Sequence, residues 1–64
     1  MEKRLLITVK EAAQRLALGR SMTYRLIQTG ALRSVKVGGA RRVLVSDLEH
    51  YVERLAQEAT SDGL

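Results

Sequence analysis

A block of basic side chains occupies the middle of the chain. Between Ala12 and Ser46 there are seven basic residues and no acidic residue, namely Arg15, Arg20, Arg25, Arg33, Lys36, Arg41 and Arg42. The acidic residues lie outside this block, at Glu2 and Glu11 on one side and from Asp47 onward on the other. Guanidinium and ammonium groups bind phosphate oxygens well, so a basic block between acidic ends, in a chain of net charge +4, indicates a surface for a polyanion.

Groups that could support catalysis or hold a metal are few. The 64 residues include no Cys and a single His, His50, and nothing in the sequence places it near Ser21 or another nucleophile. A chain of this length forms one small domain and has little scaffold for a deep pocket or a rigid catalytic set. We therefore expect a binding protein, not an enzyme, with no metal site and no cofactor.

The first element expected is a short helix. Thr8 and Glu11 have capping-box spacing, in which the Thr8 hydroxyl accepts a bond from the Glu11 N–H and the Glu11 carboxylate reaches back to the Thr8 N–H. Apolar residues then recur at helical spacing as far as Leu16, which predicts a helix over about residues 9–16. The apolar run at residues 5–7 is long enough for a short strand.

A second helix is expected over residues 20–29. Gly19 suits either the left-handed end of the first helix or the N-cap of the second, and Gly30 ends the second. Thr23, Leu26, Ile27 and Gly30 share the face expected to be buried. Arg20, Ser21, Tyr24, Arg25 and Gln28 occupy the other sides, with Met22 on a flank and expected to pack at the domain edge. Two short helices joined by a turn with Gly are a helix-turn-helix candidate.

The periodicity then changes to that of strands. Residues 35–37 alternate, residues 38–40 form a Gly-rich turn, and residues 42–45 are rich in β-branched side chains, which predicts a β-hairpin. The hairpin carries Lys36, Arg41 and Arg42.

A last helix is expected to start at a second capping box, Ser46 to Glu49. Its apolar face comprises Leu48, Tyr51, Val52 and Leu55, all expected in the core, and residues 60–64 are expected to fray. The fold class is thus mainly α with a small β-hairpin: a winged helix-turn-helix domain over residues 1–58 and a frayed tail over residues 59–64.

Residues 5–52 resemble the excisionase-type helix-turn-helix domains of the MerR-like winged-helix superfamily. The matching segments are TVKEAAQRL at residues 8–16, RSMTYRLIQTGAL at residues 20–32, VKVGG at residues 35–39 and RVLVSDLEHYV at residues 42–52. This resemblance implies a DNA-binding domain. The chain departs from the family pattern at two positions: Gly19 stands where Ser is usual, and Thr23 stands where an aliphatic residue is usual. The stretch after Val45 is too short for the coiled coil of MerR-type sensors.

The candidate DNA-binding residues are spread over the second helix and the hairpin. In a major groove, the second helix would present Arg20, Ser21, Tyr24, Arg25 and Gln28, and Arg and Gln bond bidentately with guanine and adenine. Lys36, Arg41 and Arg42 would form a basic wing on the DNA backbone or in the minor groove, and Arg33 would touch a phosphate. Which side chains read bases stays open, and solvated surface charge is the alternative for all of them.

The resemblance implies sequence-specific DNA binding and bending by an excisionase that helps an integrase to excise a mobile element. The implied partners are double-stranded DNA, an integrase and further copies of the chain assembled head-to-tail on DNA. We expect a cytoplasmic protein, encoded by a bacterium or phage, with no membrane association. A small transcriptional regulator using the same helices is the alternative, and a protein-interaction module with a basic face is a third, weaker reading.

Overall fold

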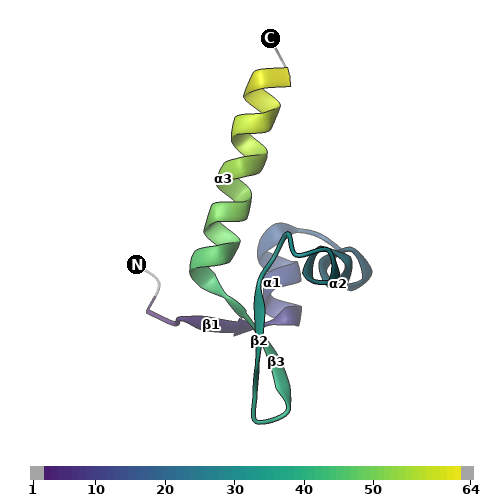
Figure 1. Ribbon diagram of the computed structural model, residues 1–64, viewed down its shortest axis with the longest axis vertical. Coiled ribbons are helices and arrows are strands. Elements are labelled where there is room, and N and C mark those ends of the chain that lie inside the picture. Colours follow the sequence, from purple (N-terminus) through teal and green to yellow (C-terminus); the bar gives the residue numbers. More distant parts are fainter. Residues whose placement is uncertain (1–2, 63–64) are drawn as a thin grey trace.

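The computed structural model describes residues 3–62, with side chains described as far as residue 59. Its elements in order are β1 (Leu6–Thr8), α1 (Val9–Leu16), α2 (Arg20–Gln28), β2 (Ser34–Val37), β3 (Ala40–Leu44) and α3 (Val45–Asp62). Figure 1 shows α1 and α2 on one side of the sheet, with the β2–β3 hairpin and α3 projecting in opposite directions. The structure confirms the predicted winged helix-turn-helix order, and it places the short strand expected at residues 5–7 at Leu6–Thr8.

Pairing of β1 with β3 turns the hairpin into a three-stranded antiparallel sheet of order β1-β3-β2. Ile7 lies opposite Val43 in the β1–β3 pair. An isolated hairpin is marginal in water, so this third strand supports the base of the wing while its tip extends beyond the helices. At the tip, Gly38 and Gly39 both have positive φ, at 57° and 86°, as a two-residue hairpin turn requires.

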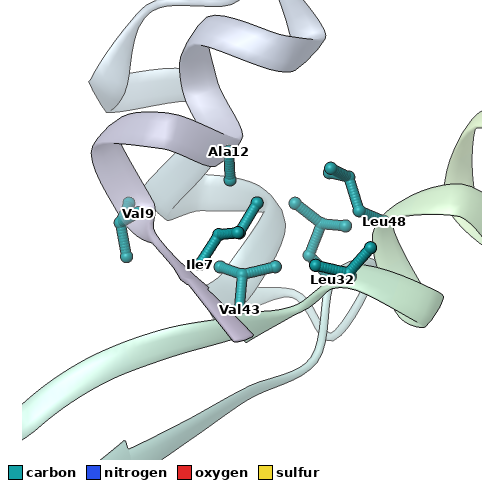
Figure 2. Packing of buried hydrophobic residues seen from close by; sticks show 7 residues of the cluster. Ile7, Val9, Ala12, Leu32, Val43 and Leu48 are labelled. Carbon is teal, nitrogen blue, oxygen red and sulfur yellow. The ribbon is translucent and has the colours of Figure 1, made fainter. Parts of the chain in front are cut away.

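The core lies where the sheet, α1 and α3 meet. Figure 2 shows the side chains from β1, β3 and the two helices pointing toward one another. The cluster comprises Ile7, Val9, Ala12, Leu32, Val43, Val45 and Leu48. Leu32, in the connection after α2, is only 1% exposed, so the core also fixes the point where the chain leaves the helix pair and enters the wing.

Ala17 ends α1 and Gly19 begins α2 at the turn between the two helices. Ala17 adopts the left-handed conformation after α1, with φ 59°, and Gly19 is the extended N-cap of α2. The open alternative for Gly19 is therefore resolved in favour of the N-cap. Ala17 takes the position that Gly usually fills, at a conformational cost of about 1–2 kcal/mol.

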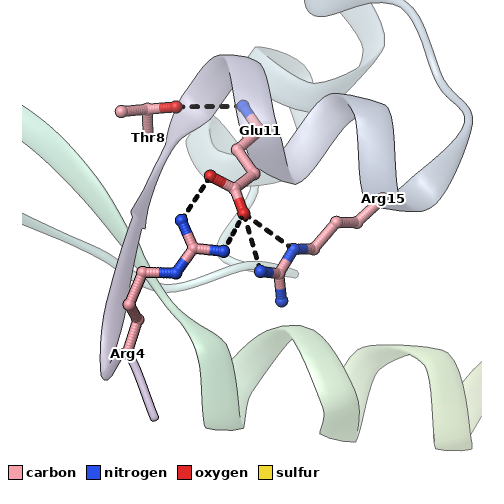
Figure 3. A network of polar contacts seen from close by, with 4 residues as sticks. All are labelled: Arg4, Thr8, Glu11 and Arg15. Atoms are coloured by element: carbon pink, nitrogen blue, oxygen red, sulfur yellow. Dashed lines mark hydrogen bonds and ion pairs between the residues drawn. The ribbon is translucent and has the colours of Figure 1, made fainter. Parts of the chain in front are cut away.

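The first capping box forms only in part. The Glu11 N–H donates to Thr8 Oγ1 at 3.0 Å, as predicted. The return bond from the Glu11 carboxylate to the Thr8 N–H was predicted wrongly, because that carboxylate accepts bonds from Arg4 and Arg15 instead (Figure 3). Two guanidinium groups outcompete one neutral amide for the same anion.

The second capping box was predicted wrongly. β3 runs straight into α3, whose helix begins at Val45, so Ser46 lies inside the helix and is not its N-cap. The Val45 N–H donates to the Leu5 carbonyl at 3.0 Å, so backbone from the β1 side satisfies an amide at this helix start.

The length and burial of α3 also differ from expectation. Its backbone is helical to Asp62, beyond residue 60 where fraying was expected, and residues 63–64 lie outside the described part. The division into a domain of residues 1–58 and a tail stays a prediction. Leu48 is buried and Tyr51 packs on the core, but Val52 and Leu55 are 48% and 45% exposed. The expectation that these two are core residues was wrong, because α3 leaves the body of the domain there (Figure 1).

Candidate nucleic-acid interface

The rotation of α2 about its axis is fixed by its inner face. Thr23 is fully buried, and its hydroxyl donates to the Gly19 carbonyl at 2.9 Å, so its polar group is satisfied inside the helix pair. Leu26 and Ile27, half-buried, pack against the core cluster. The buried face predicted from periodicity is thus confirmed for Thr23, Leu26 and Ile27, and Thr23 fills the place of an aliphatic residue without an unpaired hydroxyl. It was wrong for Gly30, which is exposed because it lies beyond the end of α2.

The other sides of α2 face solvent. All five predicted contact residues of this helix are exposed, namely Arg20, Ser21, Tyr24, Arg25 and Gln28. Met22 is 45% exposed, so about half of its surface is covered, and its packing at the domain edge stays a prediction. Gly19 supplies no side-chain cap, and no acidic residue lies in the first turn. The positive end of the helix dipole therefore adds to the charge of Arg20.

The wing carries cations on both faces. Lys36 and Arg41 are cross-strand partners, so they share one face of the sheet. That face also carries Val43, two residues along β3, and so it is the face on which α1 packs. Arg42 points to the opposite face, where it lies opposite Val35 and Thr8. Residues 34–44 contain no acidic residue, so both faces are positive.

Two of the wing arginines are tethered without losing their charge. Arg41 Nη1 donates to Ser34 Oγ at 2.8 Å, and Arg42 Nη1 donates to the Arg41 carbonyl at 3.1 Å. Both acceptors are neutral, so each guanidinium keeps donors for a phosphate. These hydrogen bonds already restrict each side chain in the free protein, so each loses less conformational entropy when it binds an anion.

Arg33 lies in the connection between α2 and β2. Its side chain is exposed, while its backbone N–H donates to Asp47 Oδ2 of α3 at 2.7 Å. Arg33 therefore lies between α2 and the wing, on a segment whose backbone is bound by Asp47 of α3.

A separate charged cluster joins α1 to Arg4, two residues before β1. Arg4 Nη1 donates to Glu11 Oε1 at 2.8 Å, and Arg15 Nη2 donates to Glu11 Oε2 at 2.6 Å (Figure 3). Hydrogen bonds from Arg4 and then Arg15 hold the pKa of Glu11 below its ordinary value. Sequence reasoning missed Arg4 here, and its spacing from Glu11 gave no helical signal. Both arginines bind the Glu11 carboxylate, which competes with a phosphate for the same guanidinium donors, so they are not candidate phosphate contacts.

Other chemistry finds little support in the described part of the chain. His50 is exposed on α3, as expected for a surface residue. Residues 3–59 contain no group of three or more His, Cys, Asp or Glu side chains placed to hold a metal ion. Over the described residues, no helix is both long enough and apolar enough to cross a bilayer.

Comparison with known proteins gives a consistent assignment. The helix-turn-helix domain family matches residues 6–56. A probable excisionase of Saccharopolyspora erythraea is 38% identical over 61 residues, which cover 95% of this chain and 62% of that protein. An excisionase of Streptomyces ambofaciens is 43% identical over 54 residues, which cover 84% of this chain and 87% of that protein.

The chain thus spans less than two thirds of the Saccharopolyspora protein and most of the Streptomyces one. No solved structure matches the chain significantly. The family match covers both helices, the wing and most of α3, which are the elements that position the basic surface. The chain belongs to the helix-turn-helix domain family, as a member of excisionase type.

Proposed function

We propose that the chain binds double-stranded DNA sequence-specifically, with α2 in the major groove and the β2–β3 wing on the adjacent backbone. The observation that carries this proposal is the fixed rotation of α2. Buried Thr23 and half-buried Leu26 and Ile27 hold one side, which leaves the polar side chains of the helix together on the exposed sides. Arg25 and Gln28 are the candidates to read bases, since both side chains can bond a base edge bidentately.

The two faces of the wing contribute differently in this proposal. Lys36 and Arg41 lie on the face shared with α1 and neutralise the strand next to α2. Arg42, on the opposite face, neutralises the other strand where the wing enters the minor groove. A hairpin with cations on both faces suits that groove, because its two walls are the two phosphate backbones. Arg33, at the base of the wing, contacts a phosphate between the two elements.

The biological role that fits this binding is that of an excisionase. Two similar proteins carry that name. In this role the chain occupies repeated sites beside a recombination site and bends the DNA for a partner integrase, without catalysis of its own. Bending a site by 40–90° costs about 1–6 kcal/mol, which the contacts of several adjacent copies offset. It acts in the cytoplasm on DNA, and it is a monomer until it assembles head-to-tail on DNA.

Footprinting tests the proposal directly. The chain is titrated onto the attachment-site DNA of its own mobile element, with and without the integrase, and onto a scrambled duplex. We expect stepwise protection of repeated sites, a bend that grows with each copy, and more excision product when the integrase is present. Equal protection of the scrambled duplex would contradict sequence-specific binding. Specific binding with no effect on excision would point to the regulator alternative.

Two variants separate base reading from phosphate binding. Arg25→Ala should weaken specific binding by about 1–3 kcal/mol and relax the preference at one base position. Arg42→Ala should weaken binding to all sequences alike. If instead Arg42→Ala altered the sequence preference and Arg25→Ala only the overall affinity, the roles assigned to helix and wing would be reversed.

A further inference from the structure

The segment that joins α2 to the wing is held by α3. Residues 29–33 form this connection, between the end of α2 and the start of β2, and its last three residues are Ala31, Leu32 and Arg33. The Ala31 carbonyl accepts a bond from Arg54 Nη2 at 3.0 Å, and the Arg33 N–H donates to Asp47 Oδ2 at 2.7 Å. Leu32, between them, is buried in the core. Each of these last three residues is therefore anchored, two of them by side chains of α3.

Asp47 and Arg54 lie on one face of α3. They are seven residues apart, which is close to two helical turns and about 10 Å along the axis. The guanidinium of Arg54 lies over the Tyr51 ring at 5.9 Å from its centroid, a cation–π contact that limits where the group can move. α3 thus presents two charged groups at a fixed spacing to two successive peptide groups of the connection.

The position of the connection decides how α2 and the wing are oriented relative to each other. Gly30, with φ 87°, lies just after α2, and the Leu32 N–H returns to the Leu26 carbonyl at 3.1 Å. β2 begins one residue after Arg33. A shift of this short segment therefore moves the wing relative to α2, and a two-element DNA interface depends on that relation.

We propose that Asp47 and Arg54 are positioning residues for DNA recognition: they set the orientation of the wing relative to α2 without touching DNA. This inference rests on the proposed DNA binding. Direct phosphate contact by Arg54 is disfavoured, because its guanidinium is engaged with Ala31 and Tyr51 and its neighbours on α3 include Glu53 and Glu58. A positioning role predicts lost specificity with unchanged salt dependence.

The first test uses DNA. Asp47→Ala and Arg54→Ala are compared with Glu53→Ala, which removes a charge from an exposed position of the same helix, at a temperature where thermal unfolding shows all variants folded. We expect the dissociation constant for the specific site to rise about five- to tenfold in the two variants. That for a scrambled duplex should change less than twofold, and the salt slope should stay constant. Hydroxyl-radical protection by the wing should weaken more than protection by α2.

The conservative variants keep the test decisive if an alanine variant unfolds. Asp47→Asn retains an acceptor for the Arg33 N–H and should recover most of the specificity, whereas Arg54→Lys retains charge but not the planar guanidinium and should recover part. A ratio of specific to scrambled binding equal to that of Glu53→Ala would overturn the proposal. So would a salt slope flattened by about 0.9 in Arg54→Ala, because that is the signature of a direct phosphate contact.

A second measurement needs no DNA. Residual dipolar couplings of the free chain report the orientation of the wing amides relative to those of α2. We expect this relative orientation to change in Asp47→Ala and Arg54→Ala and not in Glu53→Ala. Unchanged orientation would overturn the positioning role even if DNA binding were affected. If the unmodified chain bound no DNA at all, the proposed function would be refuted. The dipolar couplings would still show whether Asp47 and Arg54 set the orientation of the wing relative to α2.

Discussion

Replacing Arg41 with Ala should make DNA binding less sensitive to salt by a calculable amount. Five cations that we propose to bind phosphate lie on α2, on the wing and between them, and their side chains have no carboxylate partner among residues 3–59: Arg20, Arg33, Lys36, Arg41 and Arg42. Each phosphate neutralised contributes about −0.9 to the slope of log K against log[salt], so five contacts predict a slope of about −4.5. Between 50 and 200 mM salt, the affinity should fall about 500-fold.

Arg41→Ala removes one contact and should leave a slope of about −3.6, with a fall of about 150-fold over the same salt range. The assay is fluorescence anisotropy on one labelled site at four or more salt concentrations. Lys10→Ala is the matched control, because it removes one positive charge from an exposed position of α1, outside α2 and the wing. Its slope should equal that of the unmodified chain.

Two results would refute this reasoning. A slope shallower than about −2 for the unmodified chain would mean that most of the five cations do not reach the backbone. Equal flattening by Lys10→Ala and Arg41→Ala would mean that net charge, and not the placement of the cations on the wing, sets the salt dependence.

Three further changes test the fold that carries this surface. Ala17→Gly should raise the free energy of unfolding by about 0.5–1 kcal/mol in a denaturant titration, because Gly tolerates the left-handed φ of 59°; no gain would mean that Ala17 is unstrained. Thr23→Val should change the free energy of unfolding by less than about 1 kcal/mol, because the Gly19 carbonyl still accepts a bond from the backbone N–H of residue 23, at 3.1 Å. Thr23→Ser should destabilise the fold more than Thr23→Val does, because it loses a buried methyl. If Thr23→Val were the more destabilising of the two, the hydroxyl bond would matter more than the methyl. Glu11 has a lowered pKa in the folded state, so its ionised form stabilises the fold above the ordinary pKa of 4.5, and this contribution is lost as pH falls through the lower, folded value. Melting temperatures of the unmodified chain and Glu11→Gln should therefore converge on acidification, and a constant difference between pH 7 and pH 3 would contradict the role of the cluster.

The chain's local elements could be predicted because their signals are local. Helical spacing predicted α1 over residues 9–16, as observed, and α2 to within a residue of its end. The Gly38–Gly39 turn predicted the hairpin, because few other residues adopt two successive positive φ values. The polar set on α2 followed from the same periodicity that places Thr23 inside. Its contact with DNA stays a proposal.

Errors arose where a residue had more than one available partner. The Glu11 carboxylate had a nearby amide by sequence, yet it binds Arg4, which β1 brings alongside α1. Ser46 had cap spacing, yet the helix begins one residue earlier, where the Val45 N–H meets the Leu5 carbonyl. In both cases a contact across the fold replaced the local one.

The sequence by itself determined the order of the elements, the polar face of α2 and the basic character of the wing, because each depends on neighbours within a few residues. Only the tertiary structure decided the rest. It paired β1 with β3, divided the wing cations between two faces, left Val52 and Leu55 about half exposed, and brought α3 against the α2–wing connection. Periodicity indicates which face of a helix or strand is apolar or charged. What lies opposite that face depends on how segments far apart in the sequence pack together, and a local pattern does not encode that packing.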